Sequence, residues 1–183
     1  MQNSLQQSIK KITSILDSLN INYHLTGGLV SSFYGEPRFT QDVDFVIIFP
    51  DNLIVDKLIA KLKNEYFFDE EAIKDAIVRK SLFQVLDEEQ MIKIDFHVGE
   101  AIEGELSRSK KVEILPNLSI PIVSKEDAIL SKIIWVQKGS HKSRRDIKGM
   151  LFDKSNVDFE YLNNKLDELK LNEFFNSIIS SND

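Results

Sequence analysis

The sequence predicts an α/β (α+β) fold: a mixed β-sheet flanked by helices, with a C-terminal helical bundle. Two observations support this prediction. Up to residue 123, short runs rich in β-branched residues alternate with amphipathic segments, whereas from Ser124 onward only helical patterns follow. No flexible linker separates the parts, so we expect residues 1–123 to form an α/β core and residues 124–183 a helical region docked on it.

The spacing of apolar residues predicts each element in turn. Helical periodicity and turn residues predict helices over 4–19, 29–34, 52–63, 69–79, 125–138, 143–153, 158–169 and 172–180. Apolar or alternating runs predict strands over 21–25, 43–49, 81–86, 91–98, 112–115 and 118–123. The run 43–49 is apolar enough to be buried on both faces, and the strands 81–86 and 91–98 are close enough to form a hairpin.

Composition excludes several classes of protein. The 183 residues carry a net charge of −6, which disfavours a protein that coats nucleic acid non-specifically. With no cysteine, disulfide scaffolds, Cys-ligated zinc, iron–sulfur clusters and thiol nucleophiles are excluded. No apolar run reaches about 18–20 residues and the N-terminus lacks signal-peptide features, so we expect a cytoplasmic protein without a membrane span.

Two aspartates open the apolar run 43–49. Side chains alternate along a strand, so Asp42 and Asp44 project from one face, about 7 Å apart. Two carboxylates this close repel each other, and a cation between them would relieve the repulsion. Their hard oxygen ligands favour Mg²⁺ or Mn²⁺. A solvated acidic strand end is the simpler alternative for this motif alone.

A third carboxylate lies within a later strand. In the run 91–98, Lys93, Asp95 and His97 share one face and the apolar residues share the other. If this strand lies beside 43–49, three carboxylates converge, which is the arrangement that can hold divalent ions about 4 Å apart. An exposed polar face of an edge hairpin is the alternative reading.

A glycine pair separates the first strand from a short helix. Gly27 and Gly28 would let backbone N–H groups approach a phosphate at a helix N-terminus, and Ser31 or Ser32 could add a hydroxyl donor. Glycine pairs are also common in ordinary turns.

The order of these motifs resembles the signature of DNA-polymerase-β-type nucleotidyltransferases. Residues 24–46 contain the glycine pair, then Arg38-Phe39-Thr40, then Asp42-Val43-Asp44, and are similar to the small bacterial branch that includes AbiEii-type toxin nucleotidyltransferases. The resemblance continues in Ile94-Asp95-Phe96, in the helix that contains Asp127 and Lys132, and in Arg145-Asp146-Ile147.

The resemblance implies a role for each motif residue. Asp42, Asp44 and Asp95 would be the catalytic metal ligands for Mg²⁺ or Mn²⁺, and Asp95 would also be the general base. The remaining residues would bind the nucleotide and its phosphates, namely Gly27, Gly28, Ser31, Arg38, Thr40 and Lys132. Independently of the resemblance, the segment 125–148 carries seven basic and three acidic residues, a net charge of +4. Within it, Lys138–Arg145 could meet an RNA or nucleotide acceptor, with a solvated turn between helices as the alternative, and Asp146 could pair with a neighbouring cation.

The resemblance further implies an enzyme that transfers a nucleoside monophosphate from an NTP to a hydroxyl acceptor. That acceptor could be a tRNA end, a protein or a small molecule, as in aminoglycoside-type adenylyltransferases, and a toxin would have an antitoxin partner. Two alternatives stay open: a non-catalytic nucleotide-binding or regulatory protein that keeps the fold, and a nucleotide-sugar glycosyltransferase that uses Asp-x-Asp. Only 41 residues precede the motif, which is short for the nucleotide-binding unit of a glycosyltransferase.

Overall fold

A computed structural model describes residues 2–51 and 53–181. Seven strands form the sheet: β1 (Asn22–Thr26), β2 (Asp42–Ile48), β3 (Tyr66–Phe67), β4 (Leu82–Asp87), β5 (Ile92–Val98), β6 (Lys110–Leu115) and β7 (Leu118–Ile122). The helices of the first part are α1 (Gln2–Ser18), α2 (Gly27–Tyr34), α3 (Leu53–Leu62) and α4 (Glu70–Arg79). Those of the second part are α5 (Lys125–Gln137), α6 (His141–Phe152), α7 (Phe159–Glu168) and α8 (Asn172–Ser180).

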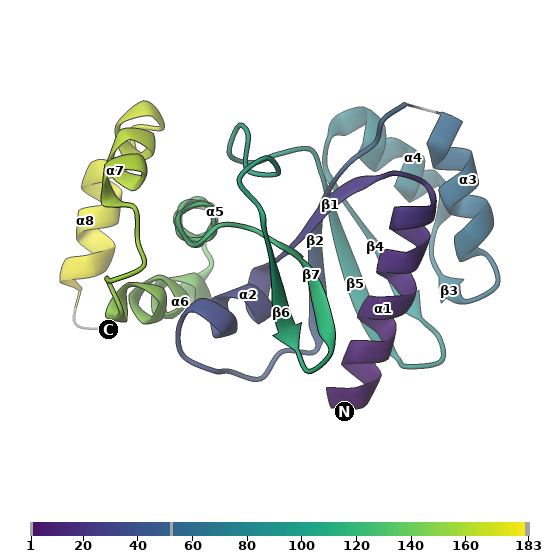
Figure 1. Ribbon diagram of the computed structural model, residues 1–183. Coiled ribbons are helices and arrows are strands. Elements are labelled where there is room, and N and C mark those ends of the chain that lie inside the picture. Colours follow the sequence, from purple (N-terminus) through teal and green to yellow (C-terminus); the bar gives the residue numbers. More distant parts are fainter. Residues whose placement is uncertain (1, 52, 182–183) are drawn as a thin grey trace.

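The strands form one mixed sheet in the order β3-β4-β5-β2-β1-β7-β6. β2 pairs in parallel with β5, and β1 in parallel with β7, whereas the other neighbours are antiparallel. Helices α1, α3 and α4 lie at one side of this sheet and α5 to α8 at the other (Figure 1). The predicted α/β class, the mixed sheet and the C-terminal helices are therefore confirmed.

One face of the central strands is sealed and the other is open to a cavity. Val43, Phe45 and Ile47 of β2 are fully buried, and the Phe45 ring stacks on Phe96 of β5 at a centroid distance of 5.8 Å. Asp42 and Asp44, on the opposite face, are only half-buried and line the cavity. The prediction that this strand is buried on both faces is therefore wrong for its first half, because the open face carries the carboxylates.

The sequence prediction missed or shifted some element ends. The two-residue strand β3 was not predicted, since so short a run has no recognisable period. The glycine pair, expected as a turn, forms the first two residues of α2. The predicted hairpin between β4 and β5 is confirmed, with Asp87 opposite Ile92.

The helical region packs directly on the α/β core. One cluster of buried apolar side chains includes Leu25 and Ile122 of the sheet together with Ile129 and Leu162 of α5 and α7. Gly35, at the end of α2, approaches the backbone of α6: a Cβ at residue 35 would lie 2.7 Å from the Met150 nitrogen. The division at residue 123 coincides with the end of the sheet, but its status as a domain boundary stays a prediction.

No helix among the described residues is long and apolar enough to cross a bilayer.

The close approach at Gly35 predicts a specific sensitivity. A Gly35→Ala change would cost stability because the added Cβ would clash with the backbone of α6. We expect a loss of about 1–3 kcal/mol in urea unfolding, typical of overpacking. The neighbouring Glu36→Ala change removes only an exposed ion pair with Arg145 and should cost less than about 0.5 kcal/mol. Equal effects of the two changes would contradict the tight docking.

Candidate active site

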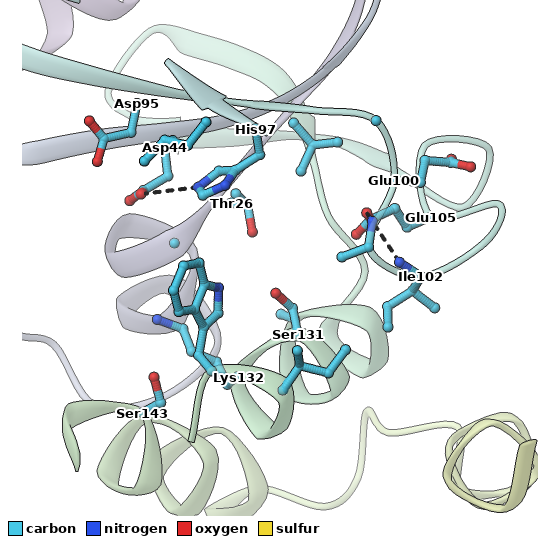
Figure 2. A pocket seen from close by; sticks show the side chains of 18 of the residues that line it. Thr26, Asp44, Asp95, His97, Glu100, Ile102, Glu105, Ser131, Lys132 and Ser143 are labelled. Carbon is cyan, nitrogen blue, oxygen red and sulfur yellow. Dashed lines mark hydrogen bonds and ion pairs between the residues drawn. The ribbon is translucent and has the colours of Figure 1, made fainter. Parts of the chain in front are cut away.

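The candidate site is a cavity of about 1370 Å³ between the open face of the sheet and the helices α5 and α6. Figure 2 shows Asp44, Asp95 and His97 on the sheet side and Ser131 and Lys132 on the facing helix. The loop after β5 forms a third wall. The α/β core and the helical region therefore both contribute residues to the cavity that contains the predicted carboxylates.

The three predicted carboxylates come together because β2 and β5 are parallel neighbours. In their register Asp44 lies opposite Asp95, and Asp42 lies opposite Lys93. Period-two alternation then places all four side chains on one face. The sequence predicted that the three carboxylates would converge if these two strands were neighbours, and they are neighbours.

A cation already lies among the carboxylates. Lys93 Nζ donates to Asp95 Oδ2 at 3.1 Å and lies 3.6 Å from Asp42 Oδ1. Gln84, on the next strand, donates from Nε2 to Asp95 Oδ1 at 3.0 Å. The sequence placed Lys93 on the correct face but did not identify it as the counter-ion, and it missed Gln84.

The two central carboxyls have pKa values shifted in opposite directions. Burial raises the pKa of Asp95, helped by the charges of Asp44 and Asp42 and opposed by Lys93. Burial would also raise the pKa of Asp44, but the neighbouring His97, with Nε2 at 3.8 Å from Oδ1, and the charge of Lys132 hold it below its usual value. Asp44 is thus the more firmly ionised of the pair.

The glycine pair lies where neighbouring side chains leave little room for a Cβ. Gly27 has a φ of +70°, and a Cβ there would lie 1.9 Å from Asp44 Oδ2. A Cβ at Gly28 would lie 2.9 Å from Thr40 Oγ1 and 3.0 Å from an Arg38 guanidinium nitrogen. Only backbone fits here, so the start of α2 lies against the carboxylate and lines the cavity.

The two predicted phosphate-binding cations share one acidic partner. Asp146 of α6, almost fully buried, accepts a hydrogen bond from Arg38 Nε on Oδ1 at 2.9 Å, and its Oδ2 forms an ion pair with Lys132 Nζ at 2.9 Å. Arg38 Nη2 donates a second hydrogen bond, to Asp146 Oδ2, at 3.2 Å. The structure thus confirms the pairing predicted for Asp146, and it brings Arg38 and Lys132 together at the cavity wall.

Thr40 and Ser31 differ in their placement. Thr40 lines the cavity beside the glycine pair. Ser31 is buried, and its hydroxyl donates to the Gly27 carbonyl at 2.9 Å, outside the lining of the cavity. Its predicted contact with phosphate receives no support from this position.

The carboxylates are suited to a divalent ion in their chemistry but are not clustered around a single point. Within residues 2–51 and 53–181, no three His, Asp or Glu side chains are grouped closely enough to hold a metal ion. Metal ligation by Asp42, Asp44 and Asp95 therefore stays a prediction.

A buried acid in the loop wall was missed by the sequence analysis. Glu105 Oε1 accepts from the Ala101 N–H at 2.7 Å and also from that of Ile102, an interaction drawn in Figure 2. Its Oε2 lies 3.8 Å from Nε2 of the buried His24. Among the described residues that Nε2 atom has no hydrogen-bond partner, whereas Nδ1 of the same ring is hydrogen-bonded to Ser109 Oγ at 2.7 Å. Burial raises the pKa of Glu105 to about 7 and lowers that of His24 to about 4, so both favour their neutral forms.

Comparison with known protein families shows to which family the chain belongs. The family model for the nucleotidyl transferase AbiEii toxin of type IV toxin–antitoxin systems matches residues 15–149. The chain belongs to the AbiEii family. The match includes the glycine pair, all three aspartates and Asp146, so the resemblance read from the sequence is confirmed. A comparison with curated proteins found no match.

Solved structures share the fold across nearly the whole AbiEii-family chain. An antigenic nucleotidyltransferase-like protein from Paracoccidioides brasiliensis is 18% identical with a TM-score of 0.54, covering 98% of this chain and 94% of its own. The lincomycin-bound lincosamide adenylyltransferase LnuA is 19% identical with a TM-score of 0.53, covering 82% and 97%. The antibiotic-resistance factor ANT(2'')-Ia is 12% identical with a TM-score of 0.62, covering 97% and 98%.

The shared use of Asp146 predicts a large loss of stability on its neutralisation. An Asp146→Asn change leaves Arg38 and Lys132 without their counter-ion, and Lys132 is only 14% exposed. We expect a destabilisation of about 3 kcal/mol in chemical unfolding, within the range for a broken buried pair. The exposed Asp75→Asn, which breaks a surface pair with Arg79, should cost less than about 1 kcal/mol. A similar small effect at both positions would show that Asp146 is not structural.

The raised pKa of Glu105 predicts a pH-dependent effect of Glu105→Gln. The wild-type carboxyl binds its proton more tightly when folded, so its contribution to stability is full below about pH 4.5 and is lost as pH rises through about 7. The amide keeps an acceptor for the two backbone N–H groups without this loss. Relative to wild type, the variant should gain up to about 3 kcal/mol in unfolding free energy between pH 4.5 and 8.5. A difference in unfolding free energy between the variant and wild type that does not change with pH would contradict the shift.

Proposed function

We propose that this AbiEii-family chain is a metal-dependent nucleotidyltransferase that moves a nucleoside monophosphate from an NTP to a hydroxyl acceptor. The observation that carries the proposal is the register that sets Asp44 opposite Asp95, with Asp42 on the same face and the glycine pair against Asp44. Carboxylates beside a glycine-rich helix start provide both the acid–base group and the phosphate contacts that phosphoryl transfer requires.

In the proposed step, the acceptor hydroxyl oxygen forms a bond to the α-phosphorus of the NTP. The bond from that phosphorus to the bridging oxygen of the β-phosphate breaks, and pyrophosphate leaves with the bonding electron pair. Asp95 takes the hydroxyl proton, a role that suits its raised pKa. The backbone at Gly27 and Gly28, with Thr40, Arg38 and Lys132, lines the same cavity and would contact the phosphates.

Asp42, Asp44 and Asp95 would hold Mg²⁺ or Mn²⁺, which would neutralise phosphate charge and make the attacking hydroxyl more acidic. The residues present fit such an ion by their chemistry: they supply carboxylate oxygens from one face, and two of them already bind the ammonium group of Lys93. Lys93 would have to give up at least part of this contact when the ion binds.

The acceptor and the partner follow from the family only as proposals. As a toxin of a type IV system, the chain would modify an RNA end or a protein and would be opposed by an antitoxin. A small-molecule acceptor is a second candidate, favoured by Glu100 and Glu103 of the loop wall, whose carboxylates could bind a cationic compound. Two proteins that share the fold act in this context: LnuA is a lincosamide antibiotic adenylyltransferase, and ANT(2'')-Ia is an antibiotic-resistance factor.

Transfer of label from NTPs tests the proposed function. The protein is incubated with each α-labelled NTP, Mg²⁺ and total RNA, and the RNA, protein and small-molecule products are separated. Asp42→Asn and Asp44→Asn should each reduce label transfer at least about 100-fold, because each removes a charge from the proposed metal site. Asp75→Asn, an exposed charge change on α4, should leave transfer unchanged.

Transfer that survives in Asp42→Asn would contradict the role of the carboxylates. Binding is followed separately by the rise in melting temperature with Mn²⁺ and NTP. If the folded wild-type protein binds NTP and metal but labels no acceptor under any condition, the non-catalytic alternative would be favoured.

A further inference from the structure

Helix α5 presents an aromatic ring to the same cavity. The cavity-lining residues of α5 and of its C-cap lie on one side of the helix, with spacings of three or four positions: Ala128, Ser131, Lys132, Ile134, Trp135 and, at the C-cap, Lys138. Trp135 is the only tryptophan of the chain. It is 41% exposed, in contrast to Ile133 and Val136 of the same helix, which are buried in the core. The indole is thus positioned at the cavity and does not serve the core.

The surroundings of Trp135 connect it to the carboxylates. Its ring meets the His97 ring edge-on, with centroids 6.1 Å apart and planes at 69°. His97 in turn lies 3.8 Å from Asp44. Lys132, one turn earlier on α5, reaches Asp146, so the helix presents first a cation and then an aromatic ring.

The outer side of the ring is flanked by a second cation. Lys138 Nζ lies over the indole at 5.2 Å from its centroid. Lys138 is exposed and carries a flexible side chain, so a flat ligand can replace this contact at small cost. An exposed aromatic face with cations on either side along the helix matches a ligand that has an aromatic group and a polyanionic group.

We infer that the Trp135 indole is the platform on which the base of the bound nucleotide stacks. The inference rests on the proposed function, because it takes the nucleotide as the ligand of the cavity. The triphosphate would occupy the side of Gly28, Arg38 and Lys132, and the base would lie farther along α5. Stacking on one indole uses the π-face that every base has, so Trp135 gives affinity for a nucleotide without selecting one base, and purines bind more tightly than pyrimidines.

The single tryptophan makes the inference directly measurable. With Mg²⁺ present, ATP should quench the intrinsic fluorescence of the wild-type protein, and UTP should quench it less. Inorganic tripolyphosphate has the phosphate groups but no base, and it should bind with little quenching. Fluorescence therefore separates contact of the base with Trp135 from binding of phosphate.

Calorimetric titration of variants measures the contribution of the ring. Trp135→Leu should weaken ATP binding roughly 10-fold and leave tripolyphosphate binding unchanged, the effect expected for loss of one stacked base. Trp135→Phe should keep most of the ATP affinity. Phe152→Leu, which removes a 91% exposed aromatic ring from α6, serves as the matched control. It should leave the affinity for ATP and for tripolyphosphate unchanged.

Three outcomes would overturn the inference. Trp135→Leu with unchanged ATP affinity would show that the base lies elsewhere, and equal losses for ATP and tripolyphosphate would assign the ring a merely structural role. Quenching by RNA or an aromatic acceptor, but not by ATP, would assign it to the acceptor. In these cases label transfer can still occur, whereas a protein that binds ATP through Trp135 but transfers no label would contradict only the proposed catalysis.

Discussion

The parallel pairing of β2 with β5 is the constraint on which the candidate site depends. It sets Asp44 opposite Asp95 and Asp42 opposite Lys93, so charge is gathered from two strands that are distant in the sequence. A slip of one residue would send the carboxylates to the face of Phe45 and Phe96, where burial without partners would be prohibitive. The apolar face therefore fixes the register, and the register fixes the chemistry of the open face.

Charge compensation links this acidic face to the helical region. Asp146 on α6 binds both Arg38, from the loop before β2, and Lys132, from α5. One carboxylate thus links three segments beside the cavity, and it holds the side chains of two cations at the cavity wall. Binding of a phosphate would draw on the same two cations, so ligand binding and the packing of α6 are coupled through one side chain.

The sequence was sufficient to predict every described helix and strand except β3, and the strand or helix face of several candidate site residues, because each of these depends on local pattern. The alternation of 91–98 correctly separated Asp95 from Phe96, and the spacing of α5 correctly placed Lys132 near the apolar stripe. The adjacency of β2 and β5 had to be assumed, since strand order is a non-local property. Lys93 as counter-ion depends on that order, and Glu105 lies in an irregular loop with no period to read.

Because Gly27 and Asp44 are in contact, a larger residue at one of these positions requires a change at the other. The carboxylate oxygen occupies the space of a side chain at residue 27, and the left-handed backbone there adds a second demand for glycine. A relative that carried a larger residue at the glycine position would have to displace or shorten the acid. The small residue is therefore an indirect marker of an intact acid, and the two should be exchanged together in any redesign of this site.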